Sequence, residues 1–187
     1  MFVVIGNGTS RKKFDLNKLS GDKFVTFGCN AIYKEFKPNY VVAIDDEYIN
    51  ILQDSDFPQH RQIIPDEEDR YELNGSGRRS NAGMNSMKEA VARGAKIVYC
   101  LGFDFLLKDN KLSVSNVFEG TKGYSAERKP RVEDNVNRVS YLNWFANKFA
   151  DVEFVFVFER KPCEIYDLAA PNIYGMYYDD FEKLTKE

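Results

Sequence analysis

The sequence predicts an α/β fold in which helices cover both faces of a mainly parallel, open β-sheet. Segments rich in apolar and β-branched residues alternate along the chain with segments of helical periodicity, and this alternation is typical of parallel strands connected through helices. The apolar segments also lack the period-two alternation of strands that face water on one side. We therefore expect them to be buried on both faces of the sheet.

The expected elements follow from short apolar runs and from helical spacing. Strands are predicted at residues 2–5, 24–29, 40–44, 61–64, 97–101 and 152–158. Short helical segments are predicted at residues 15–19, 31–36, 47–54 and 179–186, and longer helices at residues 82–93 and 133–148. The helix at 82–93 has the clearest boundaries, because Ser80 or Asn81 can cap its start and Gly94 can close it in a left-handed conformation.

Length and composition narrow the class of protein. A chain of 187 residues is long enough for one sizeable core, so we expect a single domain over residues 1–187. Its apolar content of 43% and aromatic content of 14% are those of a globular protein. A net charge of -3 argues against binding nucleic acid through bulk charge. The sequence leaves the oligomeric state open, a homo-oligomer included.

We also expect a soluble, cytoplasmic protein. No apolar run approaches the roughly 20 residues needed to span a bilayer, and no signal peptide precedes the first strand, which starts at residue 2. The three cysteines, Cys29, Cys100 and Cys163, are widely spaced, which predicts reduced and mostly buried thiols.

The residues that follow the predicted strands point to a ligand. In open α/β sheets, ligands bind beyond the carboxyl ends of the strands, at a topological switch point. Four strands end in residues suited to such a site: Gly6-Asn7-Gly8, Cys29-Asn30, Asp45-Asp46 and Gly102-Phe103-Asp104. Gly6 and Gly8 can adopt positive φ and leave no Cβ in the way, and free N–H groups beyond the strand can hold an anion, so we predict a phosphate loop. A tight turn without a ligand is the alternative.

Amide and hydroxyl groups gather at neighbouring strand ends. Asn7, Ser10 and Asn30 supply both donors and acceptors, which suit ribose hydroxyls and the edges of a base. In the alternative interpretation, Asn30 caps the helix that follows it. The helix start at Ala82 is a second predicted anion site, because its first N–H groups lack helical partners and the helix dipole favours negative charge there.

Charged side chains add further hypotheses. Arg78 and Arg79 could close over a diphosphate or remain solvated on the surface. Asp45 and Asp46 could hold Mg²⁺ against phosphate oxygens, or serve as a helix N-cap and a first-turn acid. Asp104 is either a carboxylate facing the ligand or a structural acid bonded to loop N–H groups.

The last candidate site residues are those of one loop and the single histidine. Tyr124, Glu127 and Arg128 lie in a loop that could fold over the end of the sheet, where any of them could act on a substrate. His60 is the single histidine, and we expect it at the surface because it has no partners at metal or triad spacing.

Two blocks of the sequence resemble a known family. The first, residues 2–36, contains Val-Ile-Gly-Asn-Gly-Thr-Ser and Phe-Gly-Cys-Asn-Ala-Ile-Tyr, and the second, residues 81–105, ends in Gly-Phe-Asp-Phe. Both are similar to the bacterial sialyltransferases of glycosyltransferase family 42. They equally resemble a wider group, the Maf-type motility accessory factors and the archaeal 6-hydroxymethyl-dihydropterin pyrophosphokinases.

The resemblance implies a Rossmann-like domain that holds a nucleotide between these two blocks. In the sialyltransferases this nucleotide is the CMP of CMP-sialic acid. The resemblance assigns contacts by position: Asn7, Gly8 and Ser10 to phosphate or ribose, Asn30 to the ribose or the sugar, and Asn81, Ala82 and Gly83 to phosphate or carboxylate.

This chain departs from the sialyltransferases at two places. Asn81-Ala82 stands where the family has Thr-Ser, and residues 105–150 contain no histidine to match the family's base. Tyr124 and Glu127 are candidates for that role. The predicted catalytic residues are therefore Asp104, Tyr124 and Glu127.

We predict a transferase that uses a nucleotide or nucleotide-sugar donor, CMP-linked in the first instance, and an unidentified acceptor. The predicted nucleotide-binding residues are Gly6, Asn7, Gly8, Ser10, Asn30, Asn81, Ala82, Gly83 and Gly102. One alternative is Mg²⁺-dependent pyrophosphoryl transfer from ATP, which would use Asp45 and Asp46. Another is a non-catalytic nucleotide-binding or assembly module, to which the missing histidine points.

Overall fold

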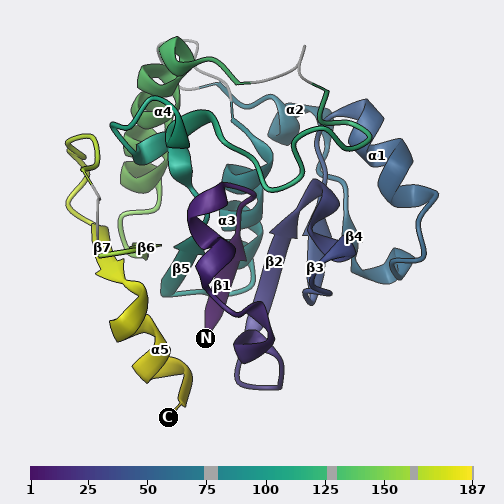
Figure 1. The fold of residues 1–187 in the computed structure, drawn as a ribbon, viewed down its shortest axis with the longest axis horizontal. Helices are drawn as coiled ribbons and strands as arrows, with labels where there is room; N and C mark the ends of the chain where they lie inside the picture. Colours follow the sequence, from purple (N-terminus) through teal and green to yellow (C-terminus); the bar gives the residue numbers. More distant parts are fainter. Residues whose placement is uncertain (74–79, 126–129, 161–163, 187) are drawn as a thin grey trace.

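The strands form one all-parallel sheet, which confirms the predicted fold class (Figure 1). The computed structural model describes residues 1–73, 80–125, 130–160 and 164–186. Within these residues, seven strands pair in the order β4-β3-β2-β1-β5-β6-β7, with each neighbouring pair parallel. They are β1 (Phe2–Ile5), β2 (Val25–Cys29), β3 (Tyr40–Val42), β4 (Gln62–Ile63), β5 (Ile97–Leu101), β6 (Glu153–Phe158) and β7 (Ile173–Tyr177).

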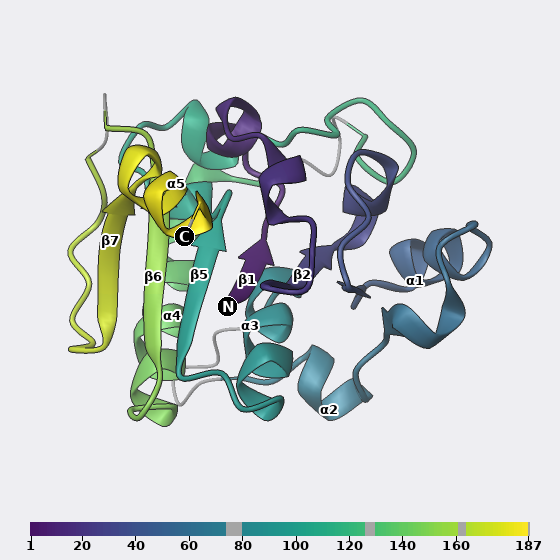
Figure 2. The same ribbon diagram turned by 90° about the horizontal axis from the view of Figure 1, so that it is seen from below.

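Helices cover both faces of this sheet (Figure 2). Helices α3 and α4 pack on one face, whereas α5 and the short helices after β1 pack on the other. The α-helices are α1 (Asp46–Gln53), α2 (Glu67–Arg70), α3 (Ala82–Ala92), α4 (Asn135–Lys148) and α5 (Tyr178–Lys186). Short 3₁₀ helices span Thr9–Lys13, Leu16–Leu19, Asn30–Lys34, Gln59–Arg61, Asp104–Leu106, Leu112–Val114 and Val132–Asp134.

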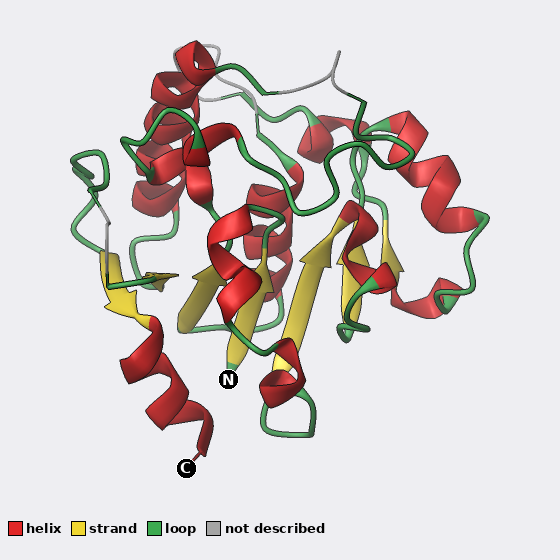
Figure 3. Cartoon of the chain, in the orientation of Figure 1, coloured by secondary structure: helices red, strands yellow, loops and turns green. Residues whose placement is uncertain are grey.

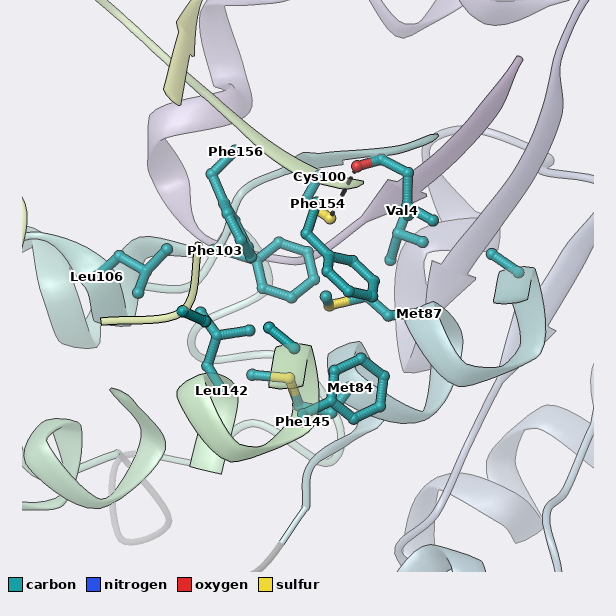
Figure 4. Packing of buried hydrophobic residues seen from close by; sticks show 14 of the residues in the cluster. Val4, Met84, Met87, Cys100, Phe103, Leu106, Leu142, Phe145, Phe154 and Phe156 are labelled. Carbon is teal, nitrogen blue, oxygen red and sulfur yellow. Dashed lines mark hydrogen bonds between the residues drawn. The ribbon is translucent and has the colours of Figure 1, made fainter. Parts of the chain in front are cut away.

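Side-chain alternation along the strands builds two apolar cores. Val4 of β1 belongs to the core under α3 and α4, while Val3 and Ile5 belong to the core on the opposite face. Figure 4 shows the first core, where Met84 of α3 and Phe145 of α4 meet. Fully burying one such side chain contributes roughly 1.5–3 kcal/mol to folding, so the two cores together hold the strand ends in fixed positions.

The strand order places a topological switch point beside β1. From β1 the sheet grows through β2, β3 and β4, and the chain then crosses to the other side of β1 to form β5, β6 and β7. A crevice is expected where strand order reverses in this way, at the carboxyl ends of β1 and β5. The segment at residues 107–125, here called the covering segment, runs across these ends from the side of α4 to the side of α1 (Figures 1 and 3).

The structure adds a strand that the sequence pattern did not predict. β7 has the sequence Ile-Tyr-Gly-Met-Tyr, and its Tyr174 and Tyr177 are exposed at the edge of the sheet. An edge strand with a central glycine shows neither continuous burial nor alternation, so nothing local marks it. Its pairing with β6 identifies it in the structure.

The predicted helix at 82–93 is present as α3. The Asn81 side chain caps it by accepting a hydrogen bond from the backbone N–H of Met84 at 3.0 Å. Gly94 follows its end with φ of +88°, which is the left-handed conformation that glycine adopts without strain. Both boundary signals in the sequence therefore act as predicted.

Two of the cysteines, Cys29 and Cys100, are buried free thiols, as expected, whereas Cys163 lies outside the described residues. Within the described ranges, no helix combines the length and the apolar character that crossing a bilayer requires.

Candidate functional site

A cavity of about 270 Å³, here called the crevice, opens at the carboxyl ends of the strands. Its walls come from the residues after β1, β2, β3 and β5, the start of α3, part of the covering segment and one residue of α4. Most of the predicted site residues line it: Gly6, Asn7, Gly8, Asn30, Asp45, Asn81, Ala82, Gly83, Gly102, Asp104 and Tyr124. The structure thus brings together side chains from distant parts of the sequence.

The glycines after β1 and β5 let two loops cross in direct backbone contact. A Cβ atom on Gly6 would lie 2.6 Å from the carbonyl oxygen of Gly102, and one on Gly102 would lie 2.7 Å from that of Gly6. We expected bare N–H groups here, but Gly6 donates to the Leu101 carbonyl at 2.8 Å and Gly8 to the Gly102 carbonyl at 3.0 Å. These two N–H groups are therefore engaged within the protein, and neither Gly6 nor Gly8 has a positive φ. Gly6 is needed for the close approach of the two backbones, which corrects the expectation of positive φ and of free N–H groups.

Asp104 anchors the loop after β1. Its carboxylate accepts hydrogen bonds from the backbone N–H of Ser10 at 2.9 Å, from the Ser10 hydroxyl, and from the Ser115 hydroxyl at 3.4 Å. Gly8 leaves room for it, since a Cβ atom there would overlap the carboxyl group. Burial raises the pKa of Asp104, and the hydrogen bonds from Ser10 lower it by less. The carboxyl group that holds this loop is also part of the crevice wall.

A buried arginine supports the same loop, and sequence reasoning missed it. Arg11 is fully buried; its Nε donates to the Gly6 carbonyl at 2.8 Å and its Nη2 to the Glu35 carboxylate at 3.0 Å. In the sequence Arg11 begins an Arg-Lys-Lys run, and such runs are usually solvated. The ion pair with Glu35 holds the guanidinium, and the hydrogen bond from its Nε holds the Gly6 carbonyl after β1.

The side chains of Asn7, Asn30 and Tyr124 meet in the crevice. The Asn7 Nδ2 group donates to the Cys29 carbonyl at 2.9 Å and to the Tyr124 hydroxyl at 3.1 Å. Burial raises the pKa of that hydroxyl, and the neighbouring Asn30 side chain lowers it by less. The Oδ1 atoms of Asn7 and Asn30 are buried and have no hydrogen-bond partner among the described residues. Because buried polar atoms in proteins are nearly always paired, these two acceptors point to donor groups on a ligand.

Asn30 reaches this cluster through an uncommon backbone conformation. Its φ is +51°, in the left-handed region that asparagine tolerates better than most residues. The cap position of the 3₁₀ helix that follows is Cys29, and no side chain caps it. The alternative role of Asn30 as a helix cap is therefore not the one that the structure gives it.

The start of α3 presents backbone to the crevice. The Asn81 Oδ1 atom is occupied by its cap to Met84, and a Cβ atom on Gly83 would lie 2.9 Å from the Phe103 ring. The crevice wall here is made by the first residues of the helix, Ala82 and Gly83, at the end where the helix dipole favours negative charge.

The covering segment is fastened on both sides of the crevice. On the side of β1, the Val117 N–H donates to the Asn7 carbonyl at 2.8 Å. On the side of α1, the Tyr48 hydroxyl donates to the Gly123 carbonyl, and the Tyr48 ring lies 4.8 Å from the Tyr124 ring. Burial raises the pKa of both tyrosines, so both hydroxyls remain protonated donors at neutral pH.

A second cavity of about 280 Å³, here called the side pocket, adjoins the crevice. It is lined by Asp45, Tyr48, Val114, Asn116, Glu119, Gly123, Tyr124, Ser125 and Pro130. The lining residues common to both cavities are Asp45, Val114, Asn116, Tyr124 and Pro130. The two cavities are therefore neighbours that share one wall.

The two aspartates after β3 lie in different surroundings. Asp45 lines both cavities, whereas the Asp46 carboxylate lies 3.2 Å from the Arg70 guanidinium and is 85% exposed. In the part of the chain that the structure describes, no group of three or more histidine, cysteine or acidic residues is arranged to hold a metal. Binding of Mg²⁺ therefore stays a prediction.

The remaining candidates lie away from the crevice or outside the described residues. Ser10 holds Asp104 and is not a lining residue. His60 is exposed, as expected. Four predicted residues fall in ranges that the structure does not describe: Arg78, Arg79, Glu127 and Arg128.

Arg138 lines the crevice from α4, and sequence reasoning did not propose it. The periodicity of its helix identifies only the apolar side that packs on the sheet. The strand ends that it joins lie far away in the sequence, so no local signal connects them to it.

Comparison with known proteins gives a likeness in fold. No protein-family model matches the chain, and no curated protein matches it. A solved structure of the sialyltransferase CstII from Campylobacter jejuni, in complex with a substrate analogue, cytidine-5'-monophosphate, matches with a TM-score of 0.51 and 15% identity, over 83% of this chain and 79% of that chain. A structure of the sialyltransferase CST-II in complex with trisaccharide acceptor and CMP covers 92% of this chain and 87% of that chain, at 15% identity and a TM-score of 0.47. The chain therefore has a sialyltransferase-like α/β fold.

Proposed function

We propose that this protein is a transferase that uses a nucleotide-sugar donor and binds its nucleotide in the crevice. The observation that carries the proposal is the pair of unpartnered Oδ1 atoms of Asn7 and Asn30 beside the Tyr124 hydroxyl. Ribose hydroxyls and the amino group of a base are donors that would satisfy both acceptors. The likeness in fold to a sialyltransferase bound to cytidine-5'-monophosphate supports a CMP-linked sugar as the first candidate donor.

The two adjoining cavities suggest a division of roles. The nucleotide would occupy the crevice, and the sugar or the acceptor would occupy the side pocket, where the Tyr48 and Tyr124 rings offer an aromatic wall. Tyr124 lines both cavities, so we propose that its hydroxyl contacts the donor near the reacting bond. Asp104 would act by holding the loop after β1 in place. Most of the rate enhancement would then come from positioning and from charge stabilisation at the phosphate.

Calorimetric titration with CMP, CDP, UDP and ATP, with and without Mg²⁺, tests nucleotide binding. We expect CMP to bind, and we expect Asn30→Gly to weaken binding by about 10-fold, because an interaction worth about 1.4 kcal/mol is lost. Glycine is the suitable replacement since it tolerates the positive φ of this position. Asn50→Ala, at an exposed position of α1, is the matched control. If none of the four nucleotides binds under either condition, the proposal is wrong.

Turnover assays separate the enzymatic alternatives. We expect nucleotide release from a CMP-linked or UDP-linked sugar when an acceptor is supplied. Mg²⁺-dependent release of AMP from ATP would instead identify pyrophosphoryl transfer. Tight nucleotide binding without release from any donor would identify a non-catalytic binding module.

A further inference from the structure

Arg138 lines the crevice, and among the described residues it forms no ion pair; the nearby Asp134 carboxylate acts on it only at longer range. Its Nη1 donates to the Asn135 Oδ1 atom at 2.8 Å and reaches the Arg131 carbonyl at 3.5 Å. Both partners are neutral groups of its own helix and of the turn before it. Among the described residues, Arg138 resembles Arg61 in bonding to neutral oxygens, whereas four other arginines pair with acids: Arg11, Arg70, Arg93 and Arg160.

This cation is held in surroundings that are unfavourable for a charge. Burial lowers the pKa of Arg138, and the nearby Asp134 carboxylate raises it by less. The side chain that orients it, Asn135, is fully buried, and the Nδ2 atom of Asn135 has no hydrogen-bond partner in the described ranges. Half-burying a guanidinium that forms no ion pair costs free energy, which a bound anion would offset.

Another part of the crevice wall favours such an anion. The start of α3, at Ala82 and Gly83, lines the same crevice, and the free N–H groups and the dipole of a helix start attract phosphate groups. A guanidinium binds a phosphate through two parallel N–H···O bonds. We propose that Arg138 binds the phosphate group of the nucleotide in the crevice, which makes the site select nucleotides over nucleosides. This inference rests on the proposed function for the identity of its ligand.

The test compares a nucleotide with its own nucleoside. CMP and cytidine are titrated by calorimetry into the wild-type protein, Arg138→Gln and Arg138→Lys. If another nucleotide binds the wild type more tightly than CMP does, that nucleotide and its nucleoside are used instead. We expect Arg138→Gln to lower the affinity for CMP about 10- to 100-fold, the range of a charged hydrogen-bonded contact, and to change that for cytidine less than 2-fold. Arg138→Lys keeps the positive charge but cannot form the two parallel hydrogen bonds of a guanidinium, so we expect an intermediate affinity for CMP. Arg131→Gln, an exposed position that does not line the crevice, is the matched charge control.

Stability in the absence of ligand separates binding from a structural role. We expect Arg138→Gln to keep or raise the melting temperature, because a half-buried charge that forms no ion pair is removed. A lower melting temperature together with equal losses for CMP and cytidine would show that Arg138 only supports the fold, and would overturn the inference. A loss confined to carboxylate-bearing donors, with CMP affinity unchanged, would overturn it as well.

Inorganic pyrophosphate tests the anion site independently of the proposed function. We expect pyrophosphate to raise the melting temperature of the wild type and of Arg131→Gln but not that of Arg138→Gln. If pyrophosphate acts in this way and no nucleotide binds, the anion site stands and the proposed function fails. If CMP binds equally to the wild type and Arg138→Gln, the proposed function stands and this inference fails.

Discussion

A Cβ atom on Gly6 would lie 2.6 Å from the carbonyl oxygen of Gly102, so the loops after β1 and β5 cross with backbone against backbone. Two residues beyond Gly102, the Asp104 carboxylate holds the backbone of Ser10. The crossing therefore sets the positions of both loops that form one wall of the crevice. The two atoms nearest to each added Cβ are backbone atoms of the other loop.

Gly102→Ala tests this crossing. Gly102 has φ of +71°, and its added Cβ atom would lie 2.7 Å from the Gly6 carbonyl oxygen. We expect a loss of about 2–4 kcal/mol in the free energy of unfolding, from backbone strain and overpacking together. Gly120→Ala is the matched control, since Gly120 has φ of +83° with no heavy atom within 4 Å of the added carbon. Equal losses for the two variants in urea denaturation would contradict the account.

Asp104→Asn tests the anchor of the loop through its pH dependence. The folded pKa of Asp104 is raised above 3.8 by burial, so the folded state binds this proton more tightly than the unfolded state does. The stability of the wild type should then fall as pH rises from about 3.8 through the folded pKa. Asparagine does not titrate, so the stability advantage of the wild type over Asp104→Asn should narrow across that window. Urea denaturation of both proteins over this pH range measures the difference in their free energies of unfolding. A difference that widens as pH rises would refute the raised pKa.

Tyr48→Phe tests how the covering segment is fastened. The variant keeps the ring that packs on Tyr124 and loses the hydrogen bond to the Gly123 carbonyl. We expect a local loss of about 1 kcal/mol, seen as about 5-fold faster hydrogen exchange at amides of the covering segment. Exchange in β5 should stay unchanged. Tyr177→Phe, at an exposed position of β7, serves as the control. If Tyr48→Phe instead accelerates exchange equally at all amides, the hydrogen bond does not hold the covering segment locally.

The buried thiols should be unreactive in the native protein. Burial raises the pKa of Cys29 to about 11 and that of Cys100 well above its ordinary value. Because the thiolate is the reactive form, a thiol reagent at pH 8 should leave both residues unmodified until urea is added. Peptide mass mapping assigns the modification to individual cysteines. Rapid native labelling of Cys29 would show that the end of β2 opens.

The sequence predicted the frame of the crevice because its signals are local. A buried parallel strand is apolar over its whole length, and the residues after it mark its carboxyl end. The ends marked by Asn7, Asn30, Asp45 and Asp104 were predicted to converge, and they line one cavity. The boundaries of α3 were likewise predicted from two local signals, the capping residue Asn81 and the glycine Gly94.

The missed features depend on contacts between distant parts of the chain. Arg11 is buried because Glu35 and the Gly6 carbonyl surround it, and no property of its own neighbours in the sequence shows this. Arg138 enters the crevice from a helix that follows the strand ends by many residues. β7 is a strand because β6 pairs with it. Contacts of this kind form only when distant segments pack together, so the local sequence pattern around each residue does not indicate them.

A crystal structure of the protein soaked with CMP tests the central claim most directly. The account predicts CMP in the crevice, with donor groups of its ribose or base at hydrogen-bond distance from the Oδ1 atoms of Asn7 and Asn30. CMP bound elsewhere, or a crevice that stays empty at saturating CMP with both Oδ1 atoms still unpartnered, would contradict it.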